Sequence, residues 1–140
     1  MADDLKALAK RFYGEVFNEG KLDVIEEIVS PDFVEHEELP VGVPPGREGV
    51  ASFVTMFREA FPDLKCEVQG MVAEGDEVWV QAVMTGTHQG EISGIPATGK
   101  KVSVSMFDRV KVKEGKVVEH WGITNDLAML TQLGVVPELG

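Results

Sequence analysis

The residues with the greatest capacity for chemistry lie in the last third of the chain, where His120 and Asp108 occupy two strand-like segments. A carboxylate beside an imidazole holds the ring in one tautomer and raises its pKa, as in an acid/base dyad. Segments 101–112 and 116–124 are expected to form one hairpin, and we expect Asp108 to lie opposite His120 there. The alternative is a structural pair on the outer or interface side of the sheet.

Two further histidines are candidate site residues. His36 stands between Glu35 and Glu37 in a short strand-like run, residues 32–38. Because side chains alternate along a strand, neither glutamate shares the face of His36, and the three residues make a poor metal site. His36 is therefore a candidate pocket acid/base or a structural residue. His88, in a loop-like segment, is a candidate ligand contact, and the sequence predicts no bound metal.

Aromatic and amide side chains are expected to form the walls of a pocket for an apolar ligand. Tyr13 lies beside the apolar stripe of the first helix, where its phenol can point into a cavity. For the other aromatic residues the alternative is a place in the core. The predicted ligand-contacting residues are Tyr13, Phe53, Phe57, Trp79, Gln81, His88, Phe107 and Trp121.

Composition restricts the possible partners. The 140 residues carry a formal net charge of −11, which disfavours nucleic acid and anionic membrane surfaces. Cys66 is the single cysteine and has no partner for an internal disulfide, so a reducing cytoplasm is expected. No apolar run is long enough to span a membrane, and the acidic residues Asp3 and Asp4 predict that residues 1–20 are not a signal peptide. No phosphate-binding glycine loop or GxSxG elbow is present.

The first half of the chain predicts three helices. Residues 3–20, 22–29 and 47–61 each carry apolar side chains at three- and four-residue steps, and they end near Gly20, Pro31 and Pro62. Residues 32–38 predict a short strand. The loop at 39–46 contains three prolines and two glycines, so it is expected to be rigid and to form part of a pocket rim.

The second half predicts a sheet. Strands at 65–73 and 77–88 flank a glycine turn, and a long glycine-rich excursion occupies 86–100. Strands 101–112 and 116–124 follow, with a three-residue loop between them, and a helix at 126–133 ends the fold. Helices followed by a long antiparallel sheet predict one α+β domain over residues 1–140. The helices pack on a curved sheet and enclose a pocket.

In the last hairpin we expect Val112 opposite Lys116. Phe107 then lies opposite Trp121, and both rings are expected to face inward beneath the helices. The other face carries an apolar strip, which is expected to face outward and to be covered by a second subunit in a homodimer. This strip contains Val102, Val104, Met106, Val110 and Val118.

Five segments carry a family resemblance. They are RFYGEVFNEGKLDVIEEIVSPDFVEH, AFPDL, GTHQGEISGIPATGK, GKVVEHW and MLTQLG, in this order through most of the chain. The order of elements resembles the cone fold of nuclear transport factor 2 and ketosteroid isomerase. Within that superfamily, the sequence resembles the SnoaL-like polyketide cyclases, also called ester cyclases. The resemblance implies ring closure by intramolecular aldol condensation, without metal or cofactor.

The resemblance also implies a catalytic aspartate a few residues after the strand's tryptophan. An ungapped match of EHW and the closing QLG places Asn125 at that position, with Asp126 next to it. An asparagine can donate a hydrogen bond to an enolate but cannot remove a proton. Asp126 is therefore a candidate acid/base, or simply the cap of the last helix.

The catalytic candidates are thus Asp126, Asn125, His36 and His120. Three functions remain open. The first is a cofactor-free enzyme acting on a mid-sized apolar carbonyl compound by aldol-type cyclisation. The second is a non-catalytic protein that binds a small hydrophobic molecule. The third is another enzyme on the same fold, such as an epoxide hydrolase, dehydratase or isomerase, which gains support if Asp108 and His120 line the cavity.

Overall fold

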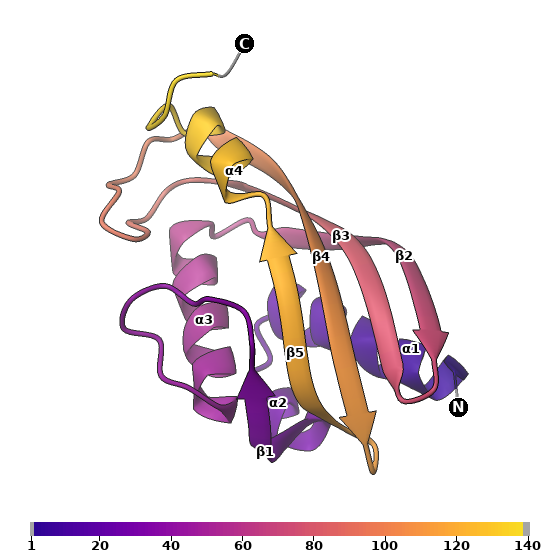
Figure 1. The fold of residues 1–140 in the computed structure, drawn as a ribbon. Helices are drawn as coiled ribbons and strands as arrows, with labels where there is room; N and C mark the ends of the chain where they lie inside the picture. The colour runs from indigo at the N-terminus through magenta and orange to yellow at the C-terminus, as the bar shows by residue number, and fades with distance from the viewer. Residues whose placement is uncertain (1, 139–140) are drawn as a thin grey trace.

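A five-stranded sheet with helices α1, α2 and α3 on one face makes up the fold (Figure 1). The computed structural model describes residues 2–138. The elements in chain order are α1 (Ala2–Arg11), the π-helix η1 (Phe12–Asn18), α2 (Asp23–Ile28), β1 (Val29–Glu35), α3 (Arg47–Ala60), β2 (Lys65–Glu74), β3 (Glu77–Thr87), β4 (Lys101–Lys113), β5 (Lys116–Thr124) and α4 (Asp126–Gln132). The predicted α+β class is confirmed.

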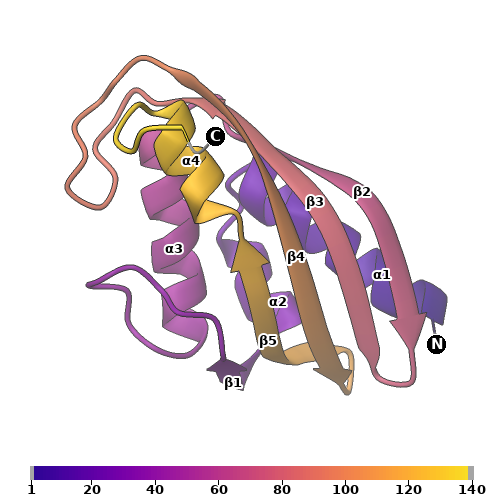
Figure 2. The same ribbon diagram turned by 45° about the horizontal axis from the view of Figure 1, so that its top comes forward.

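The sheet has the strand order β1-β5-β4-β3-β2. Only the β1–β5 pair is parallel, whereas the other three pairs are antiparallel, so the sheet is mainly antiparallel as predicted. The long strands β3 and β4 curve over the helices (Figure 2). This curvature leaves room between the inner face of the sheet and the N-terminal helices.

The first helix changes its winding along its length. The predicted helix over residues 3–20 is α-helical up to Arg11 and then continues as η1. Asn18, at the end of η1, accepts a hydrogen bond from the backbone N–H of Cys66 (2.6 Å) and donates one to its carbonyl (2.9 Å). The Arg58 guanidinium donates to the carbonyls of Phe17 and Asn18. These contacts satisfy polar groups at the helix end and fix η1 against β2.

The predicted register of the last hairpin was wrong by two positions over most of its length. A two-residue turn, Glu114-Gly115, joins the strands, and both residues have positive φ (52° and 76°). Lys113 therefore pairs with Lys116, and a further irregularity between Lys111 and Val112 places Asp108 opposite Gly122. The type of turn sets the register of a hairpin. Because the shift is even, the two strands still present the same side chains to the same face.

The predicted direction of this hairpin was also wrong. Val102, Val104 and Met106 face the helices and are 3 %, 0 % and 9 % exposed, whereas Phe107 is 58 % exposed on the outer face. Alternation separates two faces but does not say which one the helices cover. The three N-terminal helices bury the face with the aliphatic strip. Val102, Val104 and Met106 are therefore part of the core, and Val110 packs against it, so the strip gives no argument for a homodimer.

Strand β1 begins and ends three residues earlier than predicted, at Val29 and Glu35. It lies parallel to β5, with Glu35 paired with His120, and the backbone N–H of His36 donates to the carbonyl of His120 (2.9 Å). This pairing brings the residues directly after β1 alongside Gly122. Among residues 2–138, no helix is long and apolar enough to cross a membrane.

Candidate active site

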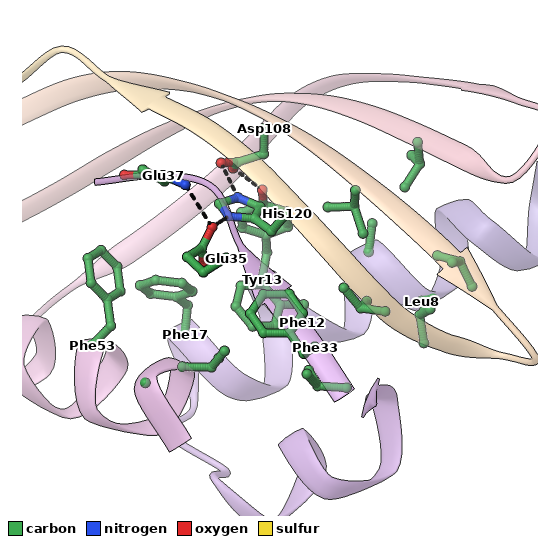
Figure 3. A pocket seen from close by; sticks show the side chains of 18 of the residues that line it. Leu8, Phe12, Tyr13, Phe17, Phe33, Glu35, Glu37, Phe53, Asp108 and His120 are labelled. Carbon is green, nitrogen blue, oxygen red and sulfur yellow. Dashed lines mark hydrogen bonds and ion pairs between the residues drawn. The ribbon is translucent and has the colours of Figure 1, made fainter. Parts of the chain in front are cut away.

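An apolar pocket lies between the N-terminal helices and the inner face of the sheet, and a group of ionisable side chains closes one part of it (Figure 3). Most of its wall is hydrocarbon from α1, η1, β1 and α3. The wall includes Leu8, Phe12, Phe17, Phe33, Val50 and Phe53. The ionisable lining residues are Tyr13, Glu35, Glu37, Asp108 and His120. Such a pocket suits a ligand with an apolar body and a few polar atoms.

His120 lies at the centre of the ionisable group. Its Nδ1 lies 2.5 Å from Oε2 of Glu35, and its Nε2 lies 2.9 Å from Oδ1 of Asp108. The side chains of His120, Glu35 and Asp108 are 20 %, 13 % and 10 % exposed. The predicted proximity of Asp108 and His120 is thus confirmed on the inner face, with Glu35 as a second partner.

The charge state of His120 follows from these contacts. Burial alone lowers its pKa, but the hydrogen bonds and charges of Asp108 and Glu35 outweigh burial and raise the pKa to about 10. At neutral pH the ring is an imidazolium whose two N–H groups each face a carboxylate. The site therefore holds an imidazolium between two carboxylates inside a largely apolar pocket.

Tyr13 joins this network from the π-helix. Its hydroxyl donates a hydrogen bond to Oδ2 of Asp108. Burial, together with the negative charge of Asp108, raises the pKa of Tyr13 well above its usual value, so the phenol stays protonated. π-helical turns occur often at functional sites, and here the turn carries the one tyrosine of the chain to the sheet. Asp108 thus accepts hydrogen bonds from both Tyr13 and His120.

Glu37 differs from the other carboxylates. Desolvation raises its pKa to about 7; the positive charge of His120 opposes this rise, and the negative charges nearby add to it. Its backbone N–H donates to Oε2 of Glu35 (3.2 Å). Within residues 2–138, its carboxyl group has no hydrogen bond or ion pair. Glu37 is therefore a free, titratable carboxyl group at the pocket.

Three ligand-type atoms, from Glu37, Asp108 and His120, lie within 4.8 Å of one another. A metal needs an imidazole nitrogen with a free lone pair. Both nitrogens of His120 lie within hydrogen-bonding distance of carboxylates, and its raised pKa keeps both protonated. This arrangement fits a proton network and does not fit a metal centre.

Three of the predicted site residues line the pocket: Tyr13, Phe53 and His120. Phe53 packs on Phe17 and Phe57, with ring centroids 6.1 Å and 4.6 Å away. Phe57 is 8 % exposed and belongs to the core behind the wall. The structure thus brings together the residues predicted from the first helix, from α3 and from β5.

Four predicted residues lie together on the outer face instead. The Trp121 ring stacks on His36, with centroids 4.6 Å apart, and the Arg109 guanidinium lies 4.1 Å from the Trp121 centroid and 5.5 Å from that of Trp79. Trp79 is 54 % exposed, and Phe107 also faces outward. The expectation that these aromatic rings form the pocket wall was wrong, because the helices cover the opposite face of the sheet.

The remaining predicted residues are also outside the pocket. Gln81 is exposed on β3. His88 is fully buried beside Phe61, and its Nδ1 lies 3.0 Å from the Thr98 hydroxyl, so it fastens the excursion after β3. Asn125 caps α4 by accepting a hydrogen bond from the Ala128 N–H (3.0 Å).

Asp126 lies in the first turn of α4 and is exposed. Partial burial raises its pKa, and its negative charge acts on Glu37. It does not line the pocket. Its surroundings match the cap region of a helix more closely than a catalytic pocket.

Glu35 and Glu37 are the site residues that sequence reasoning missed. The run FVEHE contained the signal, because alternation places Glu35 and Glu37 on the face of Phe33 and opposite to His36. Phe33 is 6 % exposed, so that face is the inner one. Two acids on the buried face of a strand were a stronger indication of a site than the histidine between them.

Comparisons with known proteins find relatives of one family. The family model described as SnoaL-like polyketide cyclase matches residues 7–133. The chain is 28 % identical over 120 residues to the nogalonic acid methyl ester cyclase of Streptomyces nogalater, which spans 84 % of this chain and 89 % of that protein. It is 30 % identical over 128 residues to the aklanonic acid methyl ester cyclase DnrD of Streptomyces peucetius, across 86 % of this chain and 84 % of that protein.

A solved structure is similar over nearly the whole length. The crystal structure of wild-type IdmH from Streptomyces antibioticus is 36 % identical, has a TM-score of 0.78, and covers 92 % of this chain and 97 % of that one. The predicted resemblance is thus confirmed by both sequence and structure. The chain therefore belongs to the SnoaL-like polyketide cyclase family.

Proposed function

We propose that this protein closes a ring in a polyketide-type carbonyl compound by intramolecular aldol addition, without loss of water and without a cofactor. The observation that carries the proposal is a buried imidazolium, His120, held between Glu35 and Asp108 at one part of an apolar pocket. An aldol closure needs a base for a proton next to a carbonyl and a positive environment for the enolate oxygen. The pocket contains carboxylates for the first need and an imidazolium for the second.

The roles follow from the contacts. His120 and Tyr13 are the proton donors at the pocket, and Asp108 orients both by accepting from each. A substrate carbonyl oxygen that enters this part of the pocket lies near the positive charge of His120, which Asp108 and Glu35 hold in place. A preorganised charge of this kind stabilises negative charge that develops in the transition state. The substrate itself is a small hydrophobic molecule, which fits the hydrocarbon wall.

The substrates in the names of two relatives supply the test. We expect the protein to convert aklanonic acid methyl ester or nogalonic acid methyl ester into a product of unchanged mass, because an aldol closure is an isomerisation. Liquid chromatography with mass spectrometry detects the new isomer. His120→Gln should slow turnover at least about 100-fold, while His36→Gln on the outer face should not. Absence of a cyclised product with both esters contradicts the proposal.

A dehydratase or epoxide hydrolase is a second candidate, because Asp108 and His120 do line the cavity. Either reaction changes the mass of the substrate by one water molecule, so the same measurement separates it from cyclisation. If the protein binds one of the esters but forms no product, the result supports a non-catalytic protein that binds a small hydrophobic molecule. The lone cysteine and the family membership support a location in the bacterial cytoplasm.

We also propose a homodimer, now through the outer face of the sheet rather than the aliphatic strip. Trp79, Phe107 and Ile123 are 54 %, 58 % and 77 % exposed there. Charges on this face are paired internally, for example Arg109 with Glu77 (2.7 Å), so two copies can meet without strong like-charge repulsion despite the net charge of −11.

Sedimentation tests the homodimer. Ile123→Asp should shift a dimer to monomer at micromolar concentration, because it places a charge in the proposed interface. Val41→Asp is the matched control, since Val41 is fully exposed in the loop after β1. A monomeric wild-type protein contradicts the proposal.

A further inference from the structure

Gly122 on β5 has no side chain, and the carboxyl group of Glu37 lies in the space that a side chain there would occupy. A Cβ atom added to Gly122 would lie 2.3 Å from Oε1 of Glu37, 2.7 Å from Oδ1 of Asp108 and 2.8 Å from Cε1 of His120. Distances under 3.0 Å are steric clashes, so no side chain fits at this position without movement of Glu37, which is nearest, and of Asp108 and His120. The absence of a side chain at position 122 is therefore what admits Glu37 to the site.

The backbone explains why these two residues meet. Strand β1 runs parallel to β5, with Glu35 paired with His120, and the pairing continues through the hydrogen bond from the His36 N–H to the His120 carbonyl. Two residues further along the chain are Glu37, just after the end of β1, and Gly122 on β5. Residues in register on parallel strands project to the same side. Glu37 thus extends across β5 into the space that a side chain at 122 would use.

The other ionisable groups of the pocket are already engaged. Both oxygens of Asp108 have partners, namely the Tyr13 hydroxyl and Nε2 of His120. Glu35 holds Nδ1 of His120, and the same Glu35 oxygen accepts from the Glu37 N–H. Among the residues that the structure describes, only the Glu37 carboxyl group faces this pocket with both oxygens unoccupied.

We propose that Glu37 is the catalytic base and acid of the reaction, and that Gly122 is the residue that permits it to act there; this rests on the proposed cyclase function. The Glu37 carboxylate takes the proton from the carbon next to a substrate carbonyl, and the C–H electron pair becomes the enolate. The enolate carbon bonds to the second carbonyl carbon of the same molecule, whose C=O pair becomes an alkoxide. The Glu37 carboxylic acid returns its proton to that alkoxide. No other reactant is consumed.

The titration of Glu37 suits this role. Its pKa of about 7 gives both carboxylate and carboxylic acid at neutral pH, the condition in which one group can accept and then return a proton. The titratable groups that face it come from η1, β1, β4, β5 and α4. They are Tyr13, Glu35, Asp108, His120 and Asp126. Of these, only His120 carries a positive charge at neutral pH.

The test compares Glu37→Gln with Glu38→Gln, since Glu38 is the exposed neighbour on the same segment and does not line the pocket. We expect Glu37→Gln to lower kcat by about 10²–10⁴ with little change in KM, and Glu38→Gln to match the wild type. The kcat/KM of the wild type should rise with pH through about 7, where the base ionises. That rise should be absent in Glu37→Gln. Circular dichroism verifies that each variant is folded.

Gly122→Ala provides an independent variant. Its methyl group would lie within clash distance of Glu37, Asp108 and His120, so it should disturb the placement of all three and lower kcat by at least about 10-fold while Glu37 itself remains. Wild-type turnover together with an unchanged rate and pH profile in Glu37→Gln overturns the assignment of Glu37 but leaves the cyclase function standing. A wild-type protein that cyclises neither methyl ester overturns both.

Discussion

Two histidine–carboxylate pairs lie on opposite faces of the same sheet, and their surroundings differ. On the inner face, His120 contacts Asp108 and Glu35, with side chains that are 10–20 % exposed. On the outer face, Nε2 of His36 lies 3.0 Å from Glu119, with side chains that are 36 % and 30 % exposed. A histidine–carboxylate pair thus lies beside the apolar pocket on the inner face and in contact with water on the outer face.

Exposure to water determines how much each histidine–carboxylate pair contributes to stability. A partly buried pair loses hydration, so its charges interact strongly and removal of one partner leaves the other unpaired. An exposed pair is screened, and its contribution to stability is small. The sequence motif of a histidine beside acids therefore says little about function until the covered face of the sheet is known. Matched substitutions on the two faces test this contrast.

The largest effect is expected from removal of the inner carboxylate. Asp108→Ala leaves the Tyr13 hydroxyl and Nε2 of His120 without their acceptor, so we expect a loss of about 3–5 kcal/mol in the free energy of unfolding. Glu119→Ala on the outer face should cost less than about 1 kcal/mol. Urea denaturation at pH 7 measures both. Equal losses in the free energy of unfolding for the two variants would contradict the proposed difference between the inner and outer faces.

The pH dependence of stability should also distinguish the two histidines. The pKa of His120 is raised in the folded state from 6.5 to about 10, so its stabilising contribution is complete below 6.5 and is lost as pH rises toward 10. We expect His120→Gln to remove an alkaline loss on the order of 3 kcal/mol, while His36→Gln retains it. Denaturation curves at pH 6, 8 and 10 provide the measurement. A wild-type protein with constant stability across this range would argue against a buried imidazolium.

A smaller effect is expected from Tyr13→Phe. The variant removes one donor from Asp108, which keeps its contact with His120, so the loss of stability should be about 1–2 kcal/mol. Turnover should fall about 10-fold, because Asp108 loses one of the two groups that hold it in place. Trp121→Phe, which alters the stack on the outer face, should leave turnover unchanged. Thermal denaturation and the cyclisation assay together separate the structural role of Tyr13 from the chemical one.

Several features could be predicted from the sequence for clear physical reasons. Helical periodicity located α3 to within one residue, and alternation between glycine turns located β3 and β5. Asp108 and His120 were expected to be neighbours, and they are, although the register was shifted. Because the register was shifted by two positions, each side chain stayed on its predicted face of the hairpin. Asp108 and His120 therefore remained neighbours.

Other features had no local signal of their own. Nothing in the alternation of β4 and β5 indicates which face α1, η1 and α3 cover, so Trp79, Phe107 and Trp121 were expected on the wrong side. Asn125 and Asp126 were favoured because of their position after the last strand, yet Asn125 is the cap of α4. The approach of Glu37 to Gly122 depends on the parallel pairing of two strands more than 80 residues apart in the chain.

The amino-acid sequence by itself determined the elements, the α+β class and the family, because these depend on local periodicity and on motifs spread along the chain. Only the tertiary structure decided which residues form the site. Burial on one face of the sheet converts Glu35, Asp108 and His120 into a charged network, and the same residue types in contact with water on the other face remain an ordinary surface pair.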